Sequence, residues 1–132
     1  KNFGLGRAGR ISPAGSTLAW GIPFTFHQDA PVIRPDMAET LWCAVCRRTR
    51  SGQLLGEEER IPVEEALKAV TIHGAYQYGE EREKGSLTPG KKADLVILDR
   101  NPMEAAPEEL REIQVLETIK EGKTVFSRKG QK

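Results

Sequence analysis

The sequence predicts an α/β fold in its first part and a mostly β fold in its second part. Helix-like and strand-like segments alternate up to about residue 80, and short strand-like segments joined by tight turns follow from residue 93. A charged, turn-rich stretch at residues 80–92 separates the two patterns. With 132 residues and an ordinary globular composition, the chain is long enough for one domain, and this stretch is its one expected internal boundary.

Residues 1–21 are expected to contain an irregular stretch followed by one short helix. Residues 1–12 are rich in Gly and Arg and are expected to be irregular. Ser12 is a suitable N-cap, and Pro13 suits the first helical position, so a helix is expected over residues 14–20. Gly21 then provides the stop for this short helix.

A buried strand and two longer helices are expected next. Residues 22–27 are β-branched, aromatic and almost continuously apolar, which is typical of a strand covered on both faces. Asp36, followed by Glu39 three residues later, forms a start resembling a capping box, and apolar residues at helical spacing extend this helix to about residue 50. A second apolar stripe predicts a helix over residues 62–79.

The second part is expected to be mainly strands. Residues 93–99 form a short apolar run that Asn-Pro ends, and residues 107–112 are predicted to form one helical turn. Residues 113–120 and 123–127 flank a Glu-Gly pair, which predicts a β-hairpin. The order of elements is therefore helix, strand, helix, helix and three strands.

The charge balance gives no support for nucleic-acid or membrane partners, and the two cysteines indicate the redox environment. The net charge is only +1, which gives no reason to expect nucleic acid or an anionic membrane, and no apolar run approaches the roughly 20 residues that span a bilayer. A small basic cluster at Arg47, Arg48 and Arg50 is expected to be a solvated or salt-bridged face. The two cysteines suggest no disulfide framework and favour a reducing, cytoplasmic location. Because the chain begins without an initiator Met, we expect it to be a piece of a longer protein.

Asp29 is the strongest candidate for chemistry. It follows the predicted buried strand, and catalytic groups gather at the C-terminal ends of parallel strands. A carboxylate there can bind a metal or take a proton from a water. Spacing alone favours the alternative, in which Asp29 caps the turn before Ala30-Pro31. His27 lies two residues earlier, on the same strand face, and could share a metal or line a pocket, although a hydrogen-bonded core role is the commoner one.

The remaining metal-binding residue types favour structural roles. His73 lies on a helix rich in Ala and Val and is interpreted as structural. Cys43 and Cys46 form a C-x-x-C pair, which provides only half of a tetrahedral zinc site. They lie within a helix rather than at its N-terminus, so buried packing is favoured over a redox or zinc function.

Several blocks of sequence, in the expected order, resemble the amidohydrolase superfamily, most closely the branch called amidohydrolase family 3, which includes N-substituted formamide deformylase-like proteins. Residues 24–32 (FTFHQDAPV) resemble its H-x-D-x-P-V motif. Residues 84–99 (KGSLTPGKKADLVILD) resemble its K-G-x-I-x-x-G-K-x-A-D-x-V-x-L-D block, which is the most diagnostic. Further resemblance lies at residues 10–16, 61–71 and 117–125, so nearly the whole chain is covered.

This resemblance implies a fragment of a metal-binding (β/α)₈ barrel with a β-sandwich. Residues 1–80 would supply the last barrel strand and its helices, and residues 81–132 would supply the C-terminal sandwich strands. Asp29 matches the family's aspartate at the end of the last strand, which contacts the metal and acts as a base toward the hydrolytic water. His27 would line the substrate pocket.

The expected function follows from what the chain contains and lacks. The resemblance implies hydrolysis of C–N bonds other than peptide bonds, in small amides or formamides, with a divalent metal, zinc first among the candidates. The family's H-x-H pair, its bridging lysine and its later histidines are missing. We therefore expect no metal binding or catalysis by this chain alone, and self-association through exposed barrel surfaces. The alternative is a non-catalytic α+β interaction module derived from the family.

Overall fold

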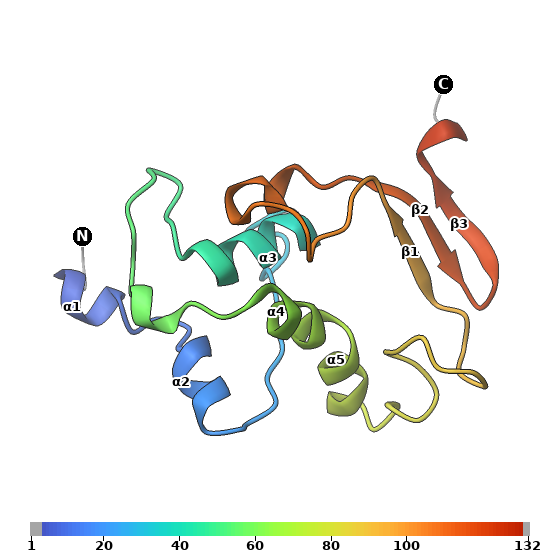
Figure 1. Ribbon diagram of the computed structural model, residues 1–132, viewed down its shortest axis with the longest axis horizontal. Helices are drawn as coiled ribbons and strands as arrows, with labels where there is room; N and C mark the ends of the chain where they lie inside the picture. Colours follow the sequence, from blue (N-terminus) through green and yellow to red (C-terminus); the bar gives the residue numbers. More distant parts are fainter. Residues whose placement is uncertain (1–3, 131–132) are drawn as a thin grey trace.

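The computed structural model describes residues 4–130 and is elongated, with the first helices at one end and a small sheet at the other (Figure 1). The elements follow in this order: α1 (Gly4–Ala8), α2 (Ala14–Ala19), α3 (Met37–Cys46), η1 (Glu57–Glu59), α4 (Val63–Val70), α5 (Ile72–Gln77), β1 (Leu95–Leu98), η2 (Pro107–Glu112), β2 (Val115–Lys120), β3 (Lys123–Ser127) and η3 (Arg128–Gly130). In the described part of the chain, none of the helices has the length and apolarity that a bilayer crossing requires.

Helix α3 is central because it packs on two sides. Leu41 and Ala44 are three residues apart and therefore share one helix face. This face joins a cluster with Ala14 of α2, Ile61 and Ala66 of α4, all of which are buried. The cluster connects the three helices α2, α3 and α4, and partly buried phenylalanines from the segment before α3 pack against it.

A second face of α3 carries Trp42 and Cys46 and packs on η2. Leu110 of η2 is completely buried there, and Ile113 closes the cluster. The guanidinium carbon of Arg111 lies 4.8 Å from the centroid of the Trp42 ring, which is a cation–π contact. The α/β part and the β part that the sequence distinguishes are thus joined through α3 and η2. Their assignment to a barrel and to a sandwich stays a prediction.

The sheet has three antiparallel strands in the order β1-β2-β3, as the sequence predicts for this part of the chain. Lys120 pairs with Lys123 across a two-residue turn. Glu121 and Gly122 both have positive φ angles, +49° and +78°, which is the backbone of a type I′ hairpin turn. The expected helical turn at residues 107–112 is confirmed as η2.

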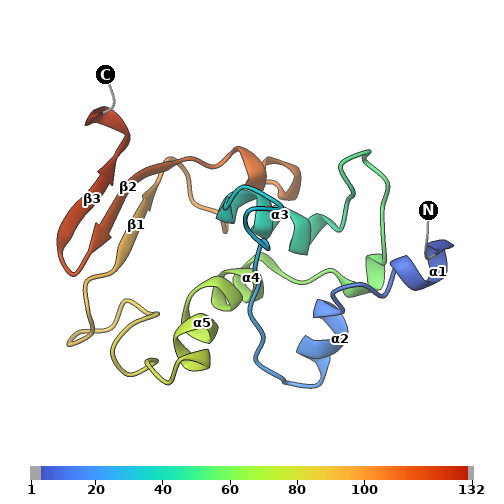
Figure 2. The same cartoon turned by 180° about the vertical axis from the view of Figure 1, so that it is seen from behind.

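The expected strand at residues 22–27 is wrong for this structure. These residues lie outside every strand and pair with none, and they run as one unpaired stretch between α2 and α3 (Figures 1 and 2). A strand is stable only when a neighbouring strand takes up its backbone N–H and C=O groups. The sheet β1-β2-β3 lies apart from this stretch, so the described chain offers it no neighbour.

The expected helices form, with different limits. Helix α3 ends at Cys46 rather than near residue 50, because Arg47 takes a left-handed backbone (φ +53°). The helix expected over residues 62–79 is divided into α4 and α5 by Thr71, whose φ and ψ of −128° and −92° are not helical. Residues 4–8, expected to be irregular, form the short helix α1; residues 1–3 are outside the described range.

One of the two expected helix caps is confirmed. The Asp36 carboxylate accepts hydrogen bonds from the backbone N–H groups of Ala38 (2.9 Å) and Glu39 (3.2 Å), as an N-cap does. Ser12 does not cap α2, because Pro13 occupies the cap position and makes no side-chain cap bond. Ser12 instead has a φ of +51°, since its carbonyl closes a tight turn to the N–H of Ala14 (2.8 Å).

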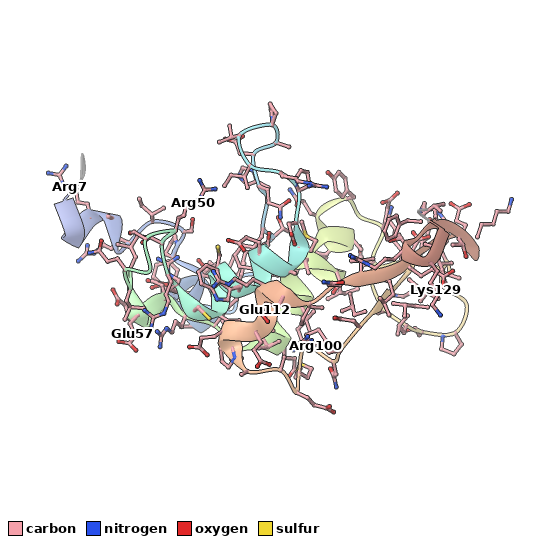
Figure 3. The ribbon with its side chains drawn as sticks, turned by 90° about the horizontal axis from the view of Figure 1, so that it is seen from above. Arg7, Arg50, Glu57, Arg100, Glu112 and Lys129 are labelled. Carbon is pink, nitrogen blue, oxygen red and sulfur yellow. The ribbon has the colours of Figure 1, made fainter. Side chains whose placement is uncertain are left out.

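The chain exposes much more surface than a compact monomer of its mass. Its accessible surface is 9673 Å², whereas a compact 14.6 kDa monomer exposes about 6,900 Å². Large apolar side chains contribute to the excess: Trp20 is 78% exposed, Val32 74% and Leu87 85%. Viewed from above, the light-blue segment before α3 stands out from a body that extends from Arg7 to Lys129 (Figure 3). In a compact monomer, many of these apolar side chains would be covered by other parts of the protein.

Candidate functional site

The candidate site lies on the segment that projects between α2 and α3. His27 and Asp29 are exposed there, and Gln28 between them is half-buried. The backbone N–H of Asp29 donates to Nδ1 of His27 at 3.1 Å, which brings the imidazole against the Asp29 backbone. Asp29 has a φ of +53°, a left-handed conformation that Asp tolerates better than most residues. Its carbonyl accepts from the Val32 N–H at 2.8 Å and so closes a turn.

The Asp29 carboxylate is not the group that holds this turn. The turn is closed by the backbone carbonyl, whereas the carboxylate makes no hydrogen bond or ion pair with the part of the chain that the structure describes. The expected strand end does not form, so His27 and Asp29 are placed by a turn rather than by a pleated strand. The carboxylate remains accessible to a group that approaches from outside residues 4–130.

A half-open hollow of about 220 Å³ lies beside the motif. His27 borders it and Asp29 does not. The rest of its wall comes from the chain before α2, the projecting segment and α3, and includes Ser12, Phe26, Gln28, Ile33, Arg34, Glu39, Thr40, Cys43 and Arg47. A pocket role for His27 agrees with this position but stays a prediction.

The donor groups fit part of a metal site. A carboxylate oxygen and an imidazole nitrogen are both common zinc ligands, and Asp29 and His27 provide one of each. A zinc site needs about four ligands, and nowhere in residues 4–130 do three His, Cys, Asp or Glu side chains gather for a metal. Any metal at Asp29 would therefore take most of its ligands from outside the described residues.

Helix α5 holds the segment that leads to the motif. Nδ1 of His73 lies 3.1 Å from the carbonyl oxygen of Phe24, and Oγ1 of Thr25 donates to Oε1 of Gln77 at 3.0 Å. The ring of Phe24 stands edge-on to Phe26, with centroids 5.4 Å apart. His73 thus has the structural role that the sequence indicates, because it contacts the backbone at Phe24, in the segment that leads to Asp29.

The two cysteines occupy different environments. Cys46 is buried, and its Sγ lies 3.3 Å from the carbonyl oxygen of Pro107, so buried packing is confirmed for it. Cys43 is exposed and borders the hollow, so the same expectation is wrong for Cys43. Neighbouring chain removes part of the water around the Cys43 thiol, which raises its pKa although the residue as a whole is exposed, and the nearby charge of Glu39 raises the pKa further. A raised pKa disfavours the thiolate that redox or zinc chemistry requires.

Arg47 has a role that the sequence does not reveal. The expected solvated or salt-bridged face is wrong for this residue, because its guanidinium donates to the backbone carbonyl oxygens of two separate segments. The acceptors are Gly9 (3.1 Å), Ile11 (2.8 Å), Ser12 (3.1 Å), Leu55 (3.1 Å) and Gly56 (3.4 Å). A Cβ on Gly56 would stand 2.0 Å from the Gly9 oxygen, so only glycine allows this close approach. Arg47 therefore fastens the chain before α2 to the loop after α3.

Glu59 is the second residue that sequence reasoning missed. It is only 5% exposed, and its carboxylate accepts from the Ser16 N–H (2.7 Å) and from the Ser16 hydroxyl (2.5 Å). The carboxylate thus satisfies a free N–H in the first turn of α2 from outside that helix. These Ser16 bonds lower the pKa of Glu59, and the charge of Arg47 lowers it further, against burial, which raises it. In the sequence, Glu59 belongs to a run of three glutamates that suggests only a polar loop.

We expect the Glu59→Gln variant to lose stability at neutral pH and to approach the wild type in acid. A carboxylate whose pKa is lowered by folding contributes stability above its ordinary pKa of about 4.3, and this contribution is lost as the pH falls through the folded pKa. Melting temperatures measured from pH 7 to pH 3 should therefore converge for the two proteins. A difference that stays constant, or that matches the exposed control Glu58→Gln, would contradict this role.

Comparisons with known proteins agree on one class. A sequence model described as amidohydrolase family matches residues 1–126. N-substituted formamide deformylase of Arthrobacter pascens is 38% identical over 121 residues, which are 92% of this chain and 22% of that protein. A 5-methylthioadenosine/S-adenosylhomocysteine deaminase of Moorella thermoacetica is 30% identical over 95 residues, 70% of this chain and 21% of that protein. The amidohydrolase structure from Thermotoga maritima MSB8 is 22% identical over 92% of this chain and 35% of that chain, with a TM-score of 0.43.

The family model and the match to the deformylase identify the class of this chain. The chain belongs to the amidohydrolase family. It spans about a fifth of the length of the curated relatives named above. The assignment rests on the sequence model and on the identity to the deformylase, and it confirms the resemblance seen in the motif blocks.

Proposed function

We propose that this chain is part of a metal-dependent hydrolase that cleaves C–N bonds other than peptide bonds, in small amides or formamides, and that it acts only within a complete protein. The observation that carries the proposal is the exposed Asp29 carboxylate within the H-x-D-x-P-V motif of a member of the amidohydrolase family. The name of the Arthrobacter relative, N-substituted formamide deformylase, supports formamides as the first substrates to test.

In this proposal the Asp29 carboxylate moves a proton. A bound divalent metal, zinc first among the candidates, would lower the pKa of a coordinated water and polarise the substrate carbonyl. Asp29 takes the proton from the attacking water and passes it to the leaving amine, since the carboxylate has no competing partner among the described residues. In the proposal, His27 lines the substrate pocket, because it borders the hollow beside the turn that carries Asp29.

The large exposed surface supports the proposed architecture. Residues 1–80 would complete a (β/α)₈ barrel, and residues 81–132 would add strands to a β-sandwich. Residues 22–27 would then pair as a strand with barrel strands from elsewhere in the protein, which supply the neighbours they lack here. The excess of 9673 Å² over about 6,900 Å² is the surface that such partners would cover. Isolated in solution, this surface would favour self-association.

The test is an assay of the complete protein on N-substituted formamides and simple amides. We expect release of amine, loss of activity after dialysis against a chelator, and recovery when zinc is added back. A complete protein that binds metal and leaves the whole panel intact would remove the hydrolase proposal and favour the non-catalytic interaction module.

A further inference from the structure

The residue between the two motif side chains is anchored to α3. The Nε2 group of Gln28 donates to Oγ1 of Thr40 at 2.5 Å and also to the backbone carbonyl of Asp36. Thr40 in turn donates its hydroxyl hydrogen to the same Asp36 carbonyl at 3.0 Å. The Asp36 carbonyl also accepts from the Thr40 backbone N–H at 3.1 Å. We call the bonds of the Gln28 side chain to Thr40 and to the Asp36 carbonyl, at the first turn of α3, the anchor.

The chemistry of this set fixes the orientation of each group. A backbone carbonyl only accepts hydrogen bonds, so the Gln28 side chain must present its NH₂ group, and not its oxygen, to Asp36. Because Thr40 gives its one hydroxyl hydrogen to Asp36, its oxygen is left to accept from Gln28. Asp36 is itself held by its N-cap bonds to Ala38 and Glu39. Gln28 is therefore held by the N-cap region of α3, which is itself fixed by hydrogen bonds.

This anchor acts directly on the proposed catalytic turn. His27 and Asp29 are the covalent neighbours of Gln28, and both are exposed. The Asp29 backbone is held on one side by His27 and on the other by Val32, both within the projecting segment. Among the described residues, the Gln28 bonds are the hydrogen bonds that join residues 27–29 to a helix. Without them, the turn would be free to move relative to α3.

We propose that Gln28 and Thr40 are positioning residues that set the place of Asp29 through the first turn of α3. The proposal rests on the proposed function, because it concerns the aim of the Asp29 carboxylate during hydrolysis. Neighbours that orient a ligand or a base typically change activity by 10–100-fold when they are removed. We expect the larger effect on the chemical step, because both residues act on Asp29 through the backbone, although both also border the hollow beside His27.

The first test compares Thr40→Val with Thr71→Val in the complete protein. Both substitutions are close in shape, and both remove a hydroxyl that bonds the carbonyl four residues earlier on a helix, since Thr71 donates to Leu67 at 2.7 Å. Thr71 makes no bond to the motif. We expect kcat to fall about tenfold for Thr40→Val, with KM within about twofold, and to stay at the wild-type value for Thr71→Val. Equal kcat values for the two variants would overturn the positioning role.

A double variant tests whether Thr40 acts through Gln28. Gln28→Ala should lower kcat by up to about a hundredfold, and adding Thr40→Val should lower it no further, because the anchor is already lost. Losses that multiply would show that the two residues act independently and would overturn the proposal.

Amide hydrogen exchange gives a readout that needs no turnover. In Gln28→Ala, which removes both bonds to the start of α3, the amides of Asp29 and Val32 should exchange about tenfold faster than in the wild type, whereas Thr71→Val should leave them unchanged. Unchanged exchange in Gln28→Ala would overturn the anchor even if the complete protein proved inactive. Faster exchange in an inactive protein would keep the anchor and reject only the hydrolase function.

Discussion

We expect Asp29→Asn in the complete protein to lower turnover by about a thousandfold, within the usual range of 10²–10⁴ for loss of a general base. Asn keeps the size of the side chain and tolerates a left-handed backbone, which Asp29 adopts with a φ of +53°. Asp29→Ala should lose as much activity, with an added backbone cost, because Ala is less stable in that conformation. Stability should change by less than about 0.5 kcal/mol for Asp29→Asn, since the side chain is exposed.

The matched control is Asp99→Asn, the same chemical change in the β part of the chain. Oδ1 of Asp99 accepts from the Gln114 N–H at 2.9 Å, and an Asn oxygen can accept the same bond. Turnover of the Asp99→Asn variant should equal that of the wild type. Turnover of Asp29→Asn within a few-fold of this control would reject the base role of Asp29.

The second large effect is expected on stability, from Arg47→Lys. Lysine keeps the charge and the left-handed position at the end of α3, but its single ammonium group cannot reproduce a planar fork that reaches Ser12, Gly9 and Gly56 together. Loss of the hydrogen bonds from the charged guanidinium to these carbonyls should lower the free energy of local opening by about 2 kcal/mol. Amide exchange in residues 9–12 and 54–57 should then become about thirtyfold faster.

Arg50→Lys is the control for this change. Arg50 is exposed and follows Arg47 by three residues, so the same substitution should leave exchange in both segments unchanged. If Arg47→Lys also left exchange unchanged, the guanidinium would not be what fastens the two segments, and the expectation of a solvated or salt-bridged face would stand.

Elements with local signals could be predicted from the sequence. The start of α3 follows from Asp36, whose carboxylate makes its cap bonds within three residues, and the β2–β3 turn follows from a Glu-Gly pair. The three strands β1, β2 and β3 lie close in sequence and pair with one another, so their partners are present. Residues 22–27 have an equally clear strand composition but no neighbour in the described chain. Composition indicates a preference for strand, and only a partner can satisfy it.

The candidate site was only partly predictable. The family motif identifies Asp29 and His27, because a motif lies in consecutive residues. Arg47 and Glu59 were missed because their partners lie 35–38 and 43 residues away on the N-terminal side, and no spacing rule connects them. The left-handed Arg47 that ends α3 carries no sequence signal, since Gly or Asn is the usual residue at such a position.

The most direct measurement of the central claim is anomalous scattering from crystals of the complete protein grown with zinc. We predict a metal ion about 2.0–2.2 Å from a carboxylate oxygen of Asp29, with most of its other ligands from parts of the protein outside residues 4–130. An occupied metal centre elsewhere in the molecule, with the Asp29 carboxylate turned to solvent and residues 22–27 still unpaired, would contradict the account.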